Sequence, residues 1–174
     1  MRAAAAAAAA VAAALGAGRA AAQAPGAVRV GPAVPEARLD VLAGRATSWH
    51  AGGGVTWGLG RYVRLGAVAG GGVTHGLPAG AERDPAPSAR LELVARFVVD
   101  PSPGLGWRWY GGAGGGALVA RGQRGLARVH LVLGADAPAV GRLRPGVELG
   151  VGGGVRVGLV LRREPVLRWR GGPG

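Results

Sequence analysis

Apolar and polar residues alternate with a period of two along most of this chain, in short runs separated by Gly, Pro and Asp clusters. Successive side chains of an extended strand point to opposite faces, so this alternation predicts β-strands that each have one apolar and one polar face. The clearest run is 90–100. Its apolar residues are Leu91, Leu93, Ala95, Phe97 and Val99, and its charged residues are Arg90, Glu92, Arg96 and Asp100.

The same parity holds in the other runs: most odd positions are apolar and most even positions are polar or Gly, and Val68 is the exception within 62–74. Short strands separated by turn residues favour an all-β chain, and an even number of antiparallel strands closes a sheet with both chain ends on one side. We therefore predict an antiparallel up-and-down meander β-barrel of about eight strands. The predicted strands are 37–45, 49–59, 61–74, 88–99, 106–119, 126–136, 143–152 and 154–163.

The first residues have the layout of a secretory signal. Met1 and Arg2 precede an apolar stretch at 3–17, and Ala22-Gln23-Ala24 stands before Pro25 as a cleavage site. Gly16, Gly18 and Arg19 interrupt the stretch before the roughly 20 residues that a spanning helix needs. We expect an exported protein divided into a signal peptide (1–24), a leader (25–36), the barrel (37–164) and a C-terminal tail (165–174).

Periodicity alone does not say which face is outside. If the even face met lipid, its arginines would each cost about 2–4 kcal/mol near the bilayer midplane, whereas the odd face carries charge only at strand ends. The alternative is a soluble, lipocalin-like periplasmic barrel whose odd face lines a cavity for an apolar ligand. The even face consists mainly of Gly with isolated Arg and Glu and lacks the Lys, Ser, Thr and Gln typical of a water-facing sheet, which favours the membrane barrel.

In a narrow eight-stranded barrel, inward glycines would leave room for long arginine side chains from neighbouring strands. Charges kept from bulk water need partners, so we expect an interior network of ion pairs that stabilises the barrel. Arginines outnumber acidic residues on this face, so the functional alternative is a narrow pore that favours anions. The predicted network is Asp40, Arg64, Arg90, Glu92, Arg96, Arg108, Arg128, His130, Glu148 and Arg156.

Five aromatic residues fall at strand ends on one side of the predicted barrel. Aromatic side chains gather at membrane interfaces, so this grouping predicts a girdle, on the periplasmic side if the mature chain starts there. Trp49 lies at the opposite end. The predicted girdle residues are Trp57, Tyr62, Phe97, Trp107 and Trp109.

With its signal-like N-terminus and the alternating runs over 37–163, the chain resembles the small outer-membrane β-barrel proteins of bacteria as a class. The resemblance implies an outer-membrane location and membrane lipids as partners, and we expect a monomer. Arg83, Arg121 and Arg124 lie in predicted loops, where they are either solvated surface charges or contacts for lipopolysaccharide phosphates.

Nothing in the sequence indicates an enzyme, a cofactor or a metal. The chain has no Cys, no two of its three histidines stand at metal-ligand spacing, and its glycine strings lack the Lys-Ser/Thr of a phosphate loop. Its formal charge of +12 is dispersed rather than gathered on one element, so we expect no nucleic-acid partner. An outer-membrane lipid-modifying enzyme would need a Ser, such as Ser48 or Ser88, beside a His and an acid. We therefore expect a non-enzymatic barrel that is structural or narrow and pore-like.

Overall fold

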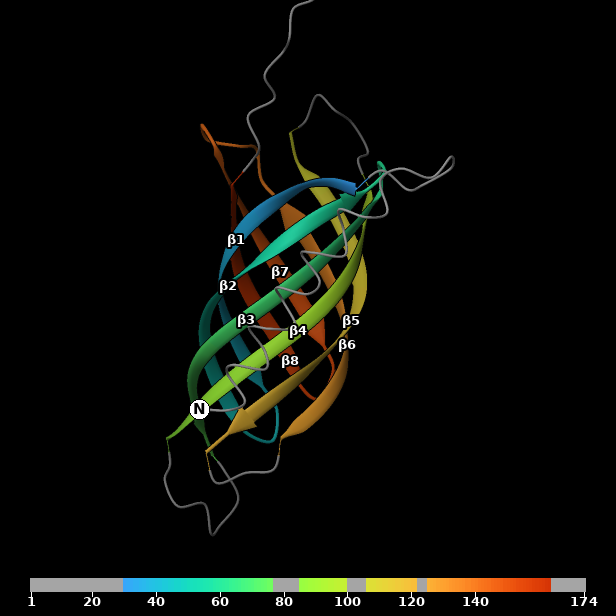
Figure 1. The fold of residues 1–174 in the computed structure, drawn as a ribbon. Coiled ribbons are helices and arrows are strands. Elements are labelled where there is room, and N and C mark those ends of the chain that lie inside the picture. The colour runs from blue at the N-terminus through green and yellow to red at the C-terminus, as the bar shows by residue number, and fades with distance from the viewer. Residues whose placement is uncertain (1–29, 77–84, 100–105, 122–124, 164–174) are drawn as a thin grey trace, which may run out of the picture.

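The computed structural model describes residues 30–76, 85–99, 106–121 and 125–163. These residues form eight strands in which each strand pairs antiparallel with the next, and β8 pairs with β1 to close the sheet (Figure 1). The strands are β1 (Val30–Ala43), β2 (Thr47–Leu59), β3 (Val63–His75), β4 (Ala86–Val99), β5 (Arg108–Ala120), β6 (Leu126–Asp136), β7 (Leu143–Val151) and β8 (Val155–Arg163). The predicted fold class, an antiparallel meander barrel of eight strands, is confirmed.

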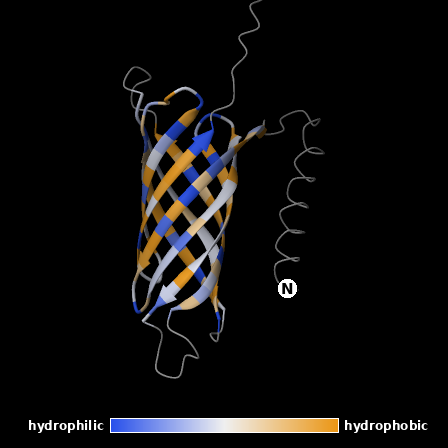
Figure 2. Cartoon of the chain, turned by 90° about the vertical axis from the view of Figure 1, so that its left-hand side faces the viewer, coloured by the Kyte–Doolittle hydropathy of each residue, from blue (hydrophilic) through white to orange (hydrophobic). Residues whose placement is uncertain are grey.

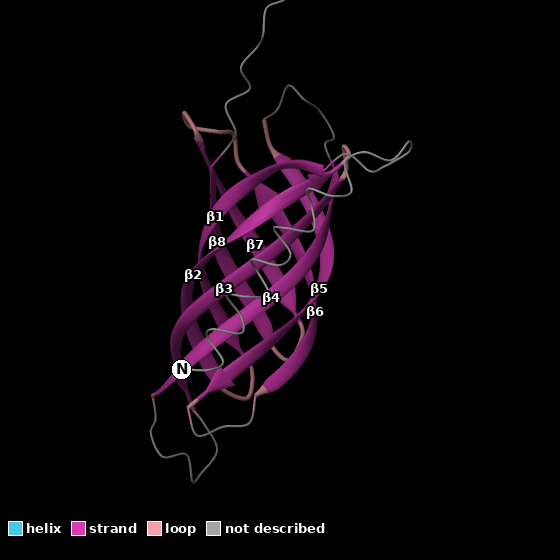
Figure 3. Ribbon diagram, in the orientation of Figure 1, coloured by secondary structure: helices cyan, strands magenta, loops and turns pink. Residues whose placement is uncertain are grey.

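The regular elements of the described residues are all strands (Figure 3). None of the described residues belongs to a helix long and apolar enough to cross a membrane. The predicted signal peptide and the whole of the predicted tail lie outside the described residues.

The barrel has two distinct ends. β1 begins and β8 finishes at one end, called the proximal end below. The connections β1–β2, β3–β4, β5–β6 and β7–β8 all lie at the other, called the distal end. There the β7–β8 turn is made by Gly152, Gly153 and Gly154 with φ of 149°, 74° and 146°, which residues with a side chain rarely adopt.

Seven predicted strands agree with the structure to within two residues at each end, but β1 differs. It begins at Val30 rather than 37, so the second half of the predicted leader is strand. Pro32 and Pro35 favoured a leader because proline disrupts strand pairing. The structure accommodates this segment with a register shift between Val30 and Ala33, after which pairing with β2 continues through Glu36.

The two faces of the strands lie as the parity predicts: odd residues point outward and even residues point into the barrel. On β6, Leu131 is 58% exposed while the next residue, Val132, is 5% exposed. Figure 2 shows the resulting alternation of hydrophobic and hydrophilic positions along the strands. Val68, the apolar exception of the 62–74 run, is buried inside the barrel together with other even-face valines such as Val94 and Val132.

Inward glycines leave the space that large interior side chains occupy. A Cβ added at Gly66 would lie 2.6 Å from Nη1 of Arg96, and one at Gly134 would overlap the ring of Tyr110. At Gly134 the added Cβ would overlap a buried ring, whereas at Gly66 it would meet the flexible end of an arginine side chain. At other inward glycines, such as Gly52 and Gly112, it would meet a backbone carbonyl of the neighbouring strand. The glycines of the even face therefore allow both bulky interior side chains and a close approach of neighbouring strands.

Replacing Gly134 by Val tests this packing. Because the added side chain would overlap the buried ring of Tyr110, we expect the G134V variant to lose about 1–3 kcal/mol of unfolding free energy, the usual cost of overpacking, in a urea titration of the folded protein. The matched control is G111V on β5, where an added Cβ meets only a carbonyl oxygen at 3.9 Å. Equal stability of the two variants would contradict the argument.

A closed charge network as the candidate functional site

The interior of the barrel is charged. All five carboxylates of the described strands lie on the even face and are at most 7% exposed, namely Glu36, Asp40, Glu92, Asp136 and Glu148. Nine arginines share that face, namely Arg38, Arg64, Arg90, Arg96, Arg108, Arg128, Arg144, Arg156 and Arg162, and none of them is exposed. The described interior therefore carries more positive than negative groups.

Glu148 on β7 is the hub of this interior. Its carboxylate accepts hydrogen bonds from Nη2 of Arg38 at 2.5 Å, from Nε of Arg96 at 3.3 Å and from Arg156. The phenol of Tyr110 donates a fourth, at 3.2 Å. Four strands besides β7 thus supply donors to one fully buried carboxylate, which ties opposite walls of the barrel together.

From this hub the ion pairs continue toward the proximal end. Arg38 also contacts Glu36 at 3.3 Å, and Arg162 lies 3.1 Å from the other oxygen of Glu36. Arg162 then pairs with Asp136, whose second oxygen is 3.7 Å from Arg64. Since all of these groups are paired with opposite charges, the cost of removing them from water is offset.

Toward the distal end, the ion pairs continue from Glu148 through Arg156. Its Nη1 lies 2.6 Å from Glu92, which in turn is 3.5 Å from Nε of Arg90. Arg90 also pairs with Asp40. The ion pairs therefore form one connected network that runs from Asp136 near the proximal end to Glu92 near the distal end.

Tyr110 reinforces the middle of the network. Its hydroxyl oxygen accepts a hydrogen bond from Arg162 at 3.2 Å, and the guanidinium groups of Arg162 and Arg96 lie 5.1 and 5.8 Å from the centre of its ring. Cations at these distances are attracted to an aromatic ring.

The middle of the barrel is closed to water. A water-filled channel would leave the side chains that line it accessible, but Arg96 and Tyr110 are each 2% exposed and Glu148 is 0% exposed. The interior at this level is a packed core of charged groups.

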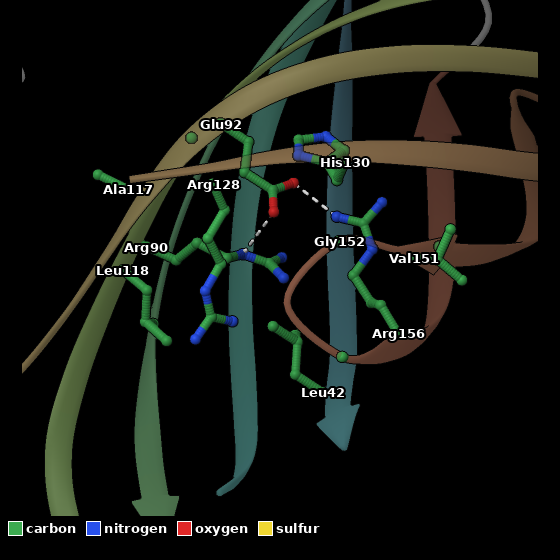
Figure 4. A pocket seen from close by; sticks show the side chains of 13 residues that line it. Leu42, Arg90, Glu92, Ala117, Leu118, Arg128, His130, Val151, Gly152 and Arg156 are labelled. Carbon is green, nitrogen blue, oxygen red and sulfur yellow. Dashed lines mark hydrogen bonds and ion pairs between the residues drawn. The ribbon is translucent and has the colours of Figure 1, made fainter. Parts of the chain in front are cut away.

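The structure brings six of the predicted network residues directly together: Asp40, Arg90, Glu92, Arg96, Glu148 and Arg156. Arg64 joins them through its ion pair with Asp136. Arg108 stands opposite Asp136 in the strand register of β5 and β6. Arg128 and His130 line a pocket at the distal end (Figure 4).

Five central residues were not in the predicted network: Glu36, Arg38, Tyr110, Asp136 and Arg162. Four of them share the even parity of the predicted strands, so the alternation was sufficient to find them. Glu36 was missed because the prolines before it placed it in the leader.

One serine and one histidine also meet inside the barrel. Nε2 of His50 lies 3.0 Å from Oγ of Ser88. Nδ1 of His50 has no hydrogen-bond partner among the described residues, and the nearby Asp40 is paired with arginines. The described residues therefore hold no Ser-His-acid triad, nor a group of three His, Asp or Glu arranged for a metal ion.

The predicted girdle residues lie around the proximal end. Tyr62, Phe97, Trp107 and Trp109 are about half exposed, and the rings of Tyr62 and Phe97 stack with centroids 5.8 Å apart. Trp57 lies near the end of β2 on the same side, whereas the exposed Trp49 is at the distal end.

Substitution of Glu148 by Gln tests the hub. The E148Q variant keeps the shape of the side chain but leaves three buried arginines short of one negative charge, so we expect a loss of about 3–5 kcal/mol of unfolding free energy in a urea titration. Removal of one exposed charge by R163Q is the control and should change stability by less than about 0.5 kcal/mol. A stability of E148Q equal to that of R163Q would show that the network does not hold the barrel together.

No protein-family model matches the chain, and neither does any curated protein. Among solved structures, the solution NMR structure of the de novo designed TMB2.3 is similar over 77% of this chain and 95% of that chain, with 14% sequence identity and a TM-score of 0.44.

Proposed function

We propose that this protein is a bacterial outer-membrane β-barrel whose exterior contacts lipid and whose interior is sealed by the charge network, with a structural, non-enzymatic role. The observation that carries the proposal is the apolar exterior. Leu, Val and aromatic side chains cover the outer face of the barrel, including Leu93 (63% exposed), Val129 (77%) and Leu159 (56%).

The distribution of charge supports a lipid-facing exterior. Among the described residues, outward charges occur only at the ends of strands or in turns, at Arg45, Arg61, Arg121, Arg142 and Arg163. A continuous apolar surface of this kind is rare on soluble monomers because it promotes association. In a bilayer the same surface is the favoured one.

Strand length fits the same proposal. The strands have 9 to 14 residues, as in β7 and β1. A tilted strand needs about 9–11 residues to cross the hydrocarbon region. The exposed aromatic residues at the proximal end lie where an interfacial girdle belongs.

The soluble alternative required an apolar cavity for an apolar ligand. The apolar face instead lies outside, and the described interior is filled by arginines and carboxylates, which argues against a lipocalin-like carrier. Membrane lipids are then the main partners, and the exposed Arg121 at the distal end is available to lipid phosphates, including those of lipopolysaccharide.

Arginine substitutions at two depths of β8 test the proposal. Leu159 lies in the middle of the strand and Val155 at its distal end, yet their exposed fractions are nearly the same, 56% and 55%. In phospholipid vesicles we expect L159R to lose about 2–4 kcal/mol of unfolding free energy and V155R about 0–1 kcal/mol, because the cost of arginine depends on its depth. If water covers the outer face, the two variants will lose the same amount of unfolding free energy.

The sealed interior predicts that the barrel does not conduct ions. After insertion into a planar bilayer, verified by flotation of the same protein with vesicles, the current should stay at its baseline because buried ion pairs fill the middle of the barrel. Discrete open-channel steps from the wild-type protein would contradict the sealed interior and favour the pore.

A further inference from the structure

The distal end of the interior holds a pocket that the sealing network does not fill (Figure 4). Its empty space is about 420 Å³, with the solvent at its mouth included. Three arginines and one histidine from three strands, β4, β6 and β8, line it together with a single carboxylate, namely Arg90, Arg128, Arg156, His130 and Glu92.

The hydrogen-bond donors in this pocket exceed the acceptors that the described residues supply. Glu92 already receives Arg156 at 2.6 Å and lies 3.5 Å from Arg90. Nη1 of Arg90 and Nε of Arg128 are buried without a hydrogen-bond partner, as is Nε2 of His130. Buried groups of this kind are normally paired, and a guanidinium nitrogen can only donate, so the two arginine atoms indicate a missing acceptor.

Arg128 differs from the other two arginines. Arg90 and Arg156 each pair with carboxylates, whereas Arg128 forms no ion pair with any carboxylate of the described residues. It is half-buried, and the glycine turn of β7–β8 packs against it, since a Cβ added at Gly153 would lie 3.0 Å from its Nε. An arginine held in place in a pocket without a counter-charge is suited to bind an anion.

We propose that this pocket binds a phosphate-type oxyanion, with Arg128 as the main contact and Arg90 and His130 as supporting donors. Guanidinium groups match phosphate oxygens with two parallel hydrogen bonds. The ligand is either free phosphate or the phosphomonoester of a lipid head group that reaches the distal mouth. The pocket lies inside the barrel, so the proposal does not depend on what covers the outside.

The test is a titration of the full-length folded protein in alkyl maltoside micelles, whose head group carries no phosphate. The probes are inorganic phosphate and glycerol phosphate, and NMR signals of the arginine Nε–Hε groups report the contacts. We expect saturable shifts at Arg128 and Arg90, absent with chloride at equal ionic strength. Tighter binding of glycerol phosphate would identify the lipid head group as the source, and equal or tighter binding of inorganic phosphate would identify the free ion.

Matched variants assign the binding to the pocket. R128Q should weaken phosphate binding about ten- to hundredfold, the effect of losing a charged hydrogen-bond donor. R45Q removes the same charge from an exposed residue of the β1–β2 turn at the same end and should leave the affinity within about twofold. R128K, which keeps the charge without the planar fork, should weaken binding less than R128Q does.

Three results would overturn the proposal. These are shifts that rise linearly without saturating, shifts that chloride reproduces, and equal affinities of R128Q and R45Q. Arg128 makes no ion pair in the described network, so R128Q should fold, and its NMR spectrum verifies this directly. If it does not fold, R128K decides the question, and wild-type affinity in R128K would exclude the bidentate contact.

Discussion

The pairing of buried arginines with buried carboxylates is the interaction on which the rest of this barrel depends. An isolated charge inside a dry barrel is prohibitively expensive, and an arginine turned outward would meet whatever covers the apolar face. Glu148 resolves this for the arginines around it by accepting hydrogen bonds from three of them. Each of these bonds joins β7 to another strand, and those from β1 and β4 reach strands that are not its neighbours, so satisfying the charges also fixes the positions of the walls.

The glycine content follows from the same constraint. An eight-stranded barrel is just wide enough for side chains to fill, and arginine is among the longest of them. Gly66 beside Arg96 and Gly134 beside Tyr110 provide the missing volume. Glycine weakens a strand when considered alone, but here it leaves room for the charged interior. The alternation of glycine with valine and leucine is therefore a packing requirement on one face and an apolar surface on the other.

The faces of the strands were predictable from the sequence because a period of two is a local property of the backbone. Trp109 and Arg108 are on opposite faces for that reason alone. The partners of each charge were not predictable. Arg38 and Glu148 are 110 residues apart, and their contact depends on how the sheet closes between β1 and β8. Glu36 was missing from the predicted network for a different reason. Pro32 and Pro35 disfavoured a strand at this place, and the structure forms one by means of a register shift. The uncompensated position of Arg128 likewise becomes visible only when the other arginines have been matched with their acids.

Contacts between lipid and matched side chains inside and outside the barrel test the account most directly. The protein would be methyl-labelled at Leu and Val and placed in phospholipid nanodiscs, and nuclear Overhauser effects from the acyl chains would be measured. Outward Leu131, Leu149 and Val157 should show strong acyl-chain contacts, whereas the buried Val68, Val94 and Val132 should show none. Contacts of the outward methyl groups with water instead of acyl chains would contradict a lipid-facing exterior around a sealed charged interior.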